Sequence, residues 1–248
     1  MSENLQQYPI LGQSVHLSSN YLGWLIDRLE QNIGTHVITM NSEMVMQANQ
    51  SPSLASIIQK ADLVVADGAG ITLALRLNGI RQQRYAGIDL GSALLQVAGE
   101  QGNDCPVAFY GGKPAVLPKA VRFWQRKSPH LQIAIQHHGY IEAAEQEQLL
   151  AELQAQQPRI ILVALGIPRQ EVWISEHRHI CPRSIWLGVG GSFDVWSGTK
   201  ARAPEIIQKL NLEWLFRLAQ EPSRWQRILV LPQFVLLAIQ EWWQKRAK

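Results

Sequence analysis

The chain has 248 residues, of which 46% are hydrophobic and 17% are charged. That length fits one α/β domain with an appendage, and the apolar content is sufficient for a buried core, so global disorder is excluded. The net charge is +3 and the pI is near 8.9, which is too mild to indicate nucleic-acid binding by itself. Two cysteines, Cys105 and Cys181, cannot form a disulfide framework, so a reducing compartment is the simpler expectation.

The N-terminus lacks the basic region and long apolar stretch of a secretory signal, so we expect none. The longest apolar run covers residues 228–239, which is 12 residues, and it contains Pro232 and Gln233. A membrane-spanning helix needs about 20 apolar residues, so we expect no span.

Short apolar and β-branched runs alternate with longer helical patterns up to about residue 195. Strands that are apolar on both faces are typical of a parallel sheet covered by helices on both sides, which is the fold that this alternation predicts. The predicted strands are 36–40, 63–66, 107–110, 132–136, 160–165 and 185–189. The predicted helices are 43–48, 54–60, 71–77, 90–101, 114–126, 141–155 and 169–178.

Glycine or polar residues follow most of the predicted strands. In open α/β sheets, ligands bind beyond the carboxyl ends of the strands, so these endings are candidate sites. Asp67 ends one strand and precedes Gly68 and Gly70, which would let a substrate approach the backbone closely. The same aspartate is suited to capping a helix that starts near Gly70, and the residues alone do not decide between the two roles.

Two adjacent glycines, Gly111 and Gly112, lie between a strand and a helix that is predicted to hold Pro114 in its first turn. Their backbone N–H groups could meet a phosphate or a uracil edge, although such a pair is also common at ordinary turns. The chain contains neither GxGxxG nor a Walker loop, which counts against NAD or ATP as the ligand.

The endings of the last two strands offer further candidates. Gln170 both donates and accepts hydrogen bonds, as recognition of a sugar or a nucleobase requires, and we expect it to be functional. Arg169 and Glu171 could be functional or could lie in a solvated first helical turn, and the residues alone leave this open. Gly190 and Asp194 follow the last strand, where Asp194 could hold ribose hydroxyls or serve as a turn or cap residue.

The pattern changes near the C-terminus, and we divide the chain into a core at 1–203 and a helical appendage at 204–248. Helices are predicted at 204–210 and 211–220, followed by an amphipathic helix at 224–248 that is broken near Pro232. Residues 213–248 carry six cationic and three acidic side chains and four of the nine tryptophans. Cations and tryptophans around an apolar run are typical of an interfacial membrane segment, which we favour over a helix packed on the core with its tryptophans buried.

Seven stretches, in order along the chain, resemble the WecG/TagA/CpsF glycosyltransferase family. They are TMNSEMV, ADLVVADGAGI, RYAGIDL, FYGGKP, VALGIPRQEVWI, VGGSFDVWSGTKARAP and LEWLFRLAQEPSRWQR, within residues 10–227. The resemblance implies a Rossmann-like fold and an inverting transferase of cell-surface polysaccharide or teichoic-acid-type synthesis. It further implies transfer of N-acetylmannosamine or a relative from a UDP-sugar to a polyprenyl-diphosphate-linked GlcNAc. The enzyme would be peripheral on the inner face of the cell membrane, and self-association is compatible with the family.

The resemblance also assigns roles to residues. Asp67 matches the family's candidate catalytic base, which would remove the proton of the acceptor hydroxyl. Thr39 and Arg84 are expected beside it as further catalytic residues, with Thr39 either hydrogen-bonding a sugar hydroxyl or orienting Asp67. Without the resemblance, Arg84 would be read as an ordinary solvated arginine. Asn41 is expected in the same pocket, with a possible second role as a helix cap. The substrate-binding set is completed by Gly111, Gly112, Gln170, Gly190 and Asp194.

No metal or other cofactor is expected. The chain lacks the DxD motif with which many UDP-sugar transferases bind a divalent cation, and its histidine pairs lack ligand spacing. Arginines would then neutralise the departing diphosphate, and the candidates are Arg217, Arg224 and Arg227. A basic helix face could instead bind anionic lipid, and the two roles are compatible.

Three alternatives remain. The first is a UDP-glucose-type hexosyltransferase of exopolysaccharide synthesis. The second is a nucleotide-cofactor oxidoreductase, which the missing GxGxxG disfavours. The third is a non-catalytic membrane-surface scaffold, which would leave Asp67, Gln170 and Asp194 at strand ends without a reason.

Overall fold

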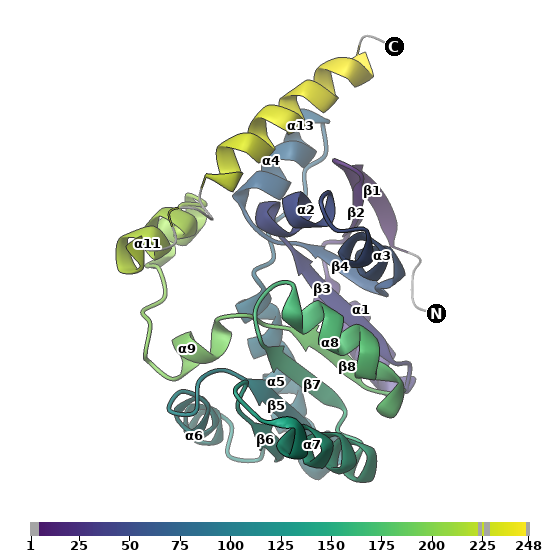
Figure 1. Cartoon of the computed structure of the whole chain (residues 1–248), viewed down its shortest axis with the longest axis vertical. Helices are drawn as coiled ribbons and strands as arrows, with labels where there is room; N and C mark the ends of the chain where they lie inside the picture. The colour runs from purple at the N-terminus through teal and green to yellow at the C-terminus, as the bar shows by residue number, and fades with distance from the viewer. Residues whose placement is uncertain (1–4, 223–224, 226–228, 247–248) are drawn as a thin grey trace.

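The computed structural model describes residues 5–222, 225 and 229–246. Its centre is a six-stranded parallel sheet with the order β4–β3–β8–β7–β5–β6, flanked by helices (Figure 1). The predicted α/β fold class and all six predicted strands are confirmed. The strands are β3 (Thr35–Met40), β4 (Leu63–Ala66), β5 (Val107–Gly111), β6 (Ile133–His137), β7 (Ile160–Ala164) and β8 (Ile185–Gly188).

The predicted helices are also present, with ends shifted by a few residues. In the core they are α2 (Ser42–Ala48), α3 (Pro52–Lys60), α4 (Ala69–Leu77), α5 (Gly87–Gln101), α6 (Leu117–Lys127), α7 (Ala143–Gln156) and α8 (Arg169–His177). A further short helix, α9 (Ser192–Trp196), was not predicted. Two short 3₁₀ turns, η1 (Gly102–Asp104) and η2 (Arg178–Ile180), follow α5 and α8. The expectation that Pro114 lies in the first turn of a helix is wrong, because α6 begins three residues later and holds Pro118 there.

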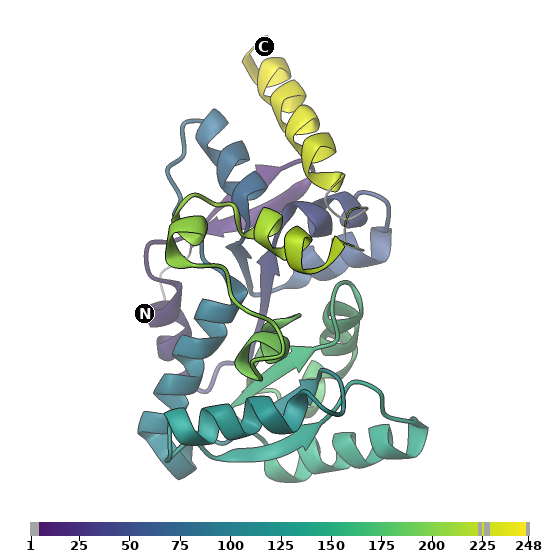
Figure 2. The same cartoon turned by 90° about the vertical axis from the view of Figure 1, so that its left-hand side faces the viewer.

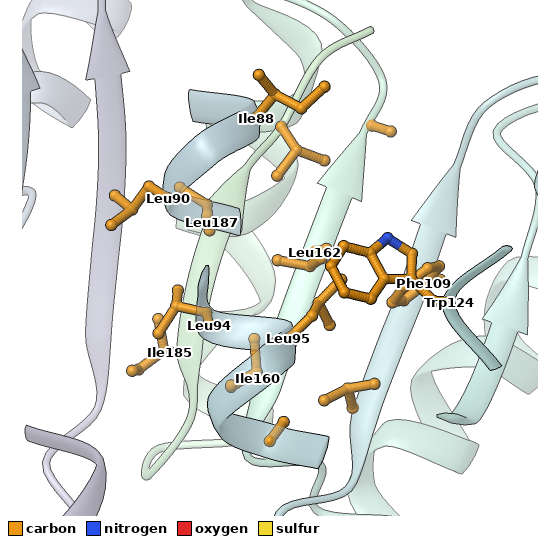
Figure 3. Close-up of a cluster of buried hydrophobic side chains, with 14 of the residues drawn as sticks. Ile88, Leu90, Leu94, Leu95, Phe109, Trp124, Ile160, Leu162, Ile185 and Leu187 are labelled. Atoms are coloured by element: carbon orange, nitrogen blue, oxygen red, sulfur yellow. The ribbon is translucent and has the colours of Figure 1, made fainter. Parts of the chain in front are cut away.

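One face of the sheet packs on a single continuous core. Side chains from α5, α6 and α9 meet alternate strand residues such as Phe109 and Leu187. Figure 3 shows Leu94 and Leu95 of α5 lying over the strands and Trp124 of α6 beside Phe109. Because strand side chains alternate between faces, the intervening residues build the core on the other side.

The opposite face carries two separate cores. Ile38 and Met40 of β3 pack with α2, α3 and α4, whereas Ile161 of β7 and Trp186 of β8 pack with α7 and α8. The boundary between these two cores therefore lies where β3 pairs with β8. In open parallel sheets ligands bind beyond the carboxyl ends of the strands, so those ends are where a site is expected.

The N-terminal part contains elements that the sequence reading did not identify. A hairpin of β1 (Gln6–Ile10) and β2 (Gln13–Leu17) is followed by α1 (Tyr21–Glu30). The backbone N–H of Val64 donates to His16 Nδ1 at 2.9 Å, so the hairpin covers the outer edge of β4. Covering an edge strand prevents its unpaired backbone groups from pairing with another chain.

The C-terminal appendage consists of α10 (Glu205–Lys209), α11 (Glu213–Gln220) and α13 (Val230–Arg246) among the described residues. Figures 1 and 2 show α13 lying over α4 and α2, at the end of the molecule farthest from α6 and α7. Phe234 and Ala238 of α13 are buried in the same core as Met44 of α2. The helix therefore packs on the globular body, which was the alternative to the membrane interpretation.

The tryptophans of the appendage do not enter the core. Trp225 and Trp243 are exposed, and Trp214 and Trp242 are partly buried. Leu236 on the outer face of α13 is also exposed, as is Leu229, the residue just before the helix. Of the helix expected over 224–248, α13 begins at Val230, which places Pro232 in its first turn, where no backbone N–H bond is lost. Residues 226–228 before it lie outside the described residues. None of the helices described is long and apolar enough to span a bilayer.

Both cysteines are buried as free thiols. Cys105 packs on one face of the sheet and Cys181 on the other, so they do not pair with each other. Burial raises the pKa of each thiol to about 11, which keeps it in the unreactive protonated form.

The packing of α13 predicts a large effect of Phe234→Ala. Phe234 is 0% exposed, so its truncation should lower the free energy of unfolding by about 3–5 kcal/mol. Leu236→Ala on the same helix is the matched control, because Leu236 is 67% exposed and its loss should change little. Urea unfolding of the full chain measures both, and equal effects would show that α13 is not docked as described.

Candidate active site

The ends of β3 and β4 place Thr39 and Asp67 on the same face of the sheet, where Thr39 pairs with Val65 and Asp67 follows Val65 by two residues. Strand side chains alternate between the two faces of the sheet, so Thr39 lies on the same face as Val37, and Asp67 on the same face as Val65. Both valines belong to the core covered by α5, so Thr39 and Asp67 lie on that face. Gly87, the first residue of α5, reaches this point: a Cβ there would lie 3.0 Å from Thr39 Oγ1. The start of α5 therefore closes over the two side chains.

Asp67 holds two hydrogen bonds at this position. Its Oδ2 accepts from the backbone N–H of Gly87 at 3.3 Å, and its Oδ1 accepts from Arg84 Nε at 3.4 Å. The N–H of a first helical residue has no partner within the helix, and the helix start carries partial positive charge. Both contacts thus set positive charge against the carboxylate, whose side chain is still 22% exposed.

The role of Asp67 as a cap of α4 is excluded. α4 has Gly68 as its N-cap and has no capping side chain. Gly68 has φ +88°, a conformation that favours glycine and turns the chain from β4 into α4. The expectation that Gly70 lets a substrate approach the backbone is wrong, because a Cβ there would meet Ser42 of α2 and Leu231 and Phe234 of α13.

Asn41 serves as a helix cap. Its Oδ1 accepts from the backbone N–H of Met44 at 3.0 Å, at the start of α2. This is one of its two expected roles, and the bond leaves the amide NH₂ available for a ligand at the end of β3.

Arg84 connects Asp67 to the C-terminal appendage. The backbone N–H of Tyr85 donates to the carbonyl of Ala66 at 3.1 Å, which holds this segment against the end of β4. Arg84 Nη2 donates to Glu213 Oε2 in α11, and Glu213 Oε1 lies 4.0 Å from Arg202 Nε. Arg84 is therefore partly buried between two carboxylates and is not a solvated surface arginine.

Gly111 and Gly112 lie away from Asp67. β5 is four strands from β4 in the sheet order, which is about 19 Å at ordinary strand spacing. The backbone N–H of Gly112 donates to the carbonyl of Ala164 at 3.0 Å, so this group is occupied in the structure. The proposed phosphate or uracil contact of these glycines stays a prediction.

Gln170 joins two strand-end loops. Its Oε1 accepts from the backbone N–H groups of Gly166 at 3.2 Å and Gly190 at 3.0 Å, and its Nε2 donates to Glu171 at 2.8 Å. Because the side chain is buried and these bonds occupy it, Gln170 positions the loops after β7 and β8. Direct contact of Gln170 or Gly190 with a substrate remains a prediction.

Glu171 is buried at 1% exposure, which excludes the solvated turn as one of its two readings. Burial raises its pKa to about 7, against the opposing effect of the Gln170 hydrogen bond. Its Oε2 has no hydrogen-bond partner among the residues that the structure describes. Sequence reasoning missed this feature because an acidic residue in a first helical turn normally faces solvent.

Asp194 and Arg217 lie at the border of core and appendage. Asp194 lies in α9 and pairs with Lys200 at 3.4 Å, and Lys200 pairs with Glu221 at 2.8 Å. Arg217 is an exposed residue of α11.

The other two proposed phosphate ligands, Arg224 and Arg227, lie outside the described residues.

The two histidine pairs of the sequence are His137 with His138 and His177 with His179. Within the described residues, one polar contact with a carboxylate is present, between His137 Nε2 and Glu152 at 3.0 Å. Within residues 5–222, 225 and 229–246, no three or more His, Cys, Asp or Glu side chains form a group that could hold a metal ion.

The buried carboxyl predicts a pH-dependent effect of Glu171→Gln. Below pH 4.5 the carboxyl is neutral in both the folded and the unfolded chain, whereas above pH 7 folding must bury a charge. The advantage of the variant in free energy of unfolding should therefore grow by about 2–3 kcal/mol from pH 5 to pH 8. Glu176→Gln, an exposed change on the same helix, should show no such trend. If the free energies of unfolding of the wild type and of Glu171→Gln changed in parallel with pH, the burial of a charge at Glu171 would be refuted.

Comparisons with known proteins show the family to which the chain belongs. The family model described as "Glycosyl transferase WecG/TagA/CpsF family" matches residues 8–248. Two relatives are each named N-acetylglucosaminyldiphosphoundecaprenol N-acetyl-beta-D-mannosaminyltransferase. The protein from Bacillus spizizenii is 35% identical over 221 residues, which is 89% of this chain and 82% of that protein. The protein from Bacillus subtilis is 33% identical over 214 residues, which is 86% of this chain and 82% of that protein. With a match over nearly its whole length, the chain belongs to the WecG/TagA/CpsF family of glycosyltransferases.

Proposed function

We propose that this enzyme transfers N-acetylmannosamine, or a closely related sugar, from a UDP donor to a polyprenyl-diphosphate-linked GlcNAc, with inversion. The names of the two Bacillus relatives support the sugar and the acceptor. The observation that carries the proposal is the Asp67 carboxylate, accessible at the carboxyl end of β4 and held by α5 and Arg84. A parallel sheet of this kind is a scaffold that binds nucleotides beyond the carboxyl ends of its strands.

In the proposed reaction, Asp67 accepts the proton of the acceptor hydroxyl as that oxygen attacks the anomeric carbon. The new C–O bond forms on the face opposite the breaking bond to the β-phosphate, and UDP leaves with the electron pair. Single displacement inverts the anomeric centre. A carboxylate can perform this step because general-base catalysis needs only a correctly placed acceptor within hydrogen-bond reach.

We propose that arginines, not a divalent cation, stabilise the departing diphosphate. The chain has no DxD motif, and guanidinium groups bind phosphate oxygens in a bidentate manner. Arg217 on the exposed face of α11 is the candidate within the described part, and Arg224 and Arg227 follow it in sequence.

We also propose that the outer face of α13 rests on the cytoplasmic side of the membrane, where the lipid-linked acceptor would be. Leu229, Leu236 and Trp243 recur every seven residues, so they lie along one side of this segment, and all three are exposed. Lys245 and Arg246 follow at the end of the helix. An apolar stripe flanked by cations is typical of helices that lie in a bilayer interface.

Replacement of Asp67 by Asn tests the proposed base. The amide keeps the size of the side chain but cannot take up the proton, so kcat should fall about 10²- to 10⁴-fold. The assay follows UDP release and sugar transfer to a short prenyl-diphosphate-GlcNAc, with UDP-glucose as a competing donor and EDTA present. Asp104→Asn, an exposed change on η1, is the control. Near-normal turnover of Asp67→Asn would remove Asp67 from the mechanism, and loss of wild-type activity with EDTA would refute metal independence.

Introducing a negative charge on the outer face of α13 tests the membrane proposal. Leu236→Glu and Trp243→Glu should each lower binding to vesicles that contain anionic lipid by about tenfold. Each removes apolar area that the bilayer would cover and adds repulsion from the anionic lipid. Gln125→Glu on α6, at the far end of the molecule in Figure 1, adds the same charge away from the proposed interface. Flotation assays measure the bound fraction, and equal loss in all three variants would show that net charge alone governs binding.

A further inference from the structure

We propose that Glu213 is a positioning residue for the reaction: it holds the Arg84 guanidinium in the orientation that leaves Asp67 free to accept a proton. This inference rests on the proposed function of Asp67 as the base. It assigns a role to a carboxylate that lies 129 residues from Arg84 in the chain and that the sequence reading did not single out.

Glu213 is the first residue of α11, and it is buried although it is charged. Its Oε2 accepts from Arg84 Nη2, and its Oε1 faces Arg202 Nε at 4.0 Å. A buried carboxylate is normally found only where cations compensate its lost hydration. Another acidic residue of the appendage, Glu205, lies on the surface in an exposed pair with Lys209.

The two contacts of Arg84 fix the plane of its guanidinium. Nε points to Asp67, and Nη2 points to Glu213. Guanidinium N–H groups form a rigid fork, so anchoring two of them determines where the others point.

The contacts at Asp67 are long. Its oxygens accept at 3.4 Å from Arg84 and 3.3 Å from Gly87, whereas bidentate arginine–carboxylate pairs lie near 2.7–2.9 Å. Without Glu213, Arg84 could turn and form a bidentate pair with Asp67, which would occupy the oxygens that the acceptor hydroxyl needs. Glu213 competes for the guanidinium and so prevents that pairing.

The surrounding charges alternate in sign along a chain of contacts. Asp67, Arg84, Glu213 and Arg202 are followed by Asp89, which pairs with Arg202 Nη2 at 2.7 Å. Removing the charge of Glu213 leaves two partly buried cations with no acid between them, which gives Arg84 a further reason to move onto Asp67.

The far end of α11 is also fixed to the core. Glu221 pairs with Lys200 at 2.8 Å, and Gln220 Nε2 donates to the carbonyl of Ala201 at 3.1 Å. The helix is thus attached at both ends, and docking of α11 is what delivers Glu213 to Arg84.

The test compares Glu213→Gln, Glu213→Asp and the control Glu205→Gln in the full chain. Glu213→Gln should lower kcat about 10- to 100-fold while the KM for the UDP-sugar changes less than about twofold, because orientation and not binding is lost. Glu213→Asp retains the charge and should recover part of kcat, and Glu205→Gln should match the wild type.

The double variant Arg84→Gln/Glu213→Gln separates positioning from a structural role. If Glu213 acts through Arg84, its replacement should lower kcat no further once Arg84 is gone. Fully multiplicative losses, or wild-type kcat in Glu213→Gln, would overturn the inference. If Glu213→Gln does not fold, the decision passes to Glu213→Asp, whose effect must likewise vanish without Arg84. A wild-type enzyme that transfers no sugar would instead overturn the proposed function, and the two failures are therefore distinguishable.

Discussion

The contact of the Asp67 carboxylate with Arg84 and with the first N–H of α5 is the interaction on which the site depends. A carboxylate at the end of a buried strand needs positive partners, and no neighbouring residue of β4 supplies them. One comes from the start of α5 and the other from the loop before it, which is held against β4 by a backbone hydrogen bond. The crossover after β4 therefore builds the site as well as connecting the strands.

The C-terminal appendage belongs to the same structure and is not a separate tail. α11 brings Glu213 against Arg84, while α13 places Phe234 in the core beneath α2 and α4. Two kinds of force thus hold it: ion pairs at the carboxyl edge of the sheet and apolar burial farther along. The outer face of α13 stays exposed, and under the proposed function this leaves one side of the same helix to bind lipid while the other side completes the fold.

The sheet was predictable from sequence because its strands are nearly all apolar and are separated by helical patterns. The hairpin at 6–10 and 13–17 was not, since its strands are short and polar and include Pro9. Asp67 could be found as an acid at a strand end, but its partners could not: a backbone N–H leaves no side-chain signal, and Glu213 is brought near only by the tertiary fold. Gln170 was identified for its hydrogen-bonding capacity, which the structure shows directed to the backbone of two loops.

The most direct test of the central claim is a crystal structure of the enzyme with a non-hydrolysable UDP-sugar and a short prenyl-diphosphate-GlcNAc. The account predicts the attacking hydroxyl within hydrogen-bond distance of an Asp67 oxygen, with Arg84 still bound to Glu213. A nucleotide-sugar bound elsewhere, or a different carboxylate beside the hydroxyl, would contradict it.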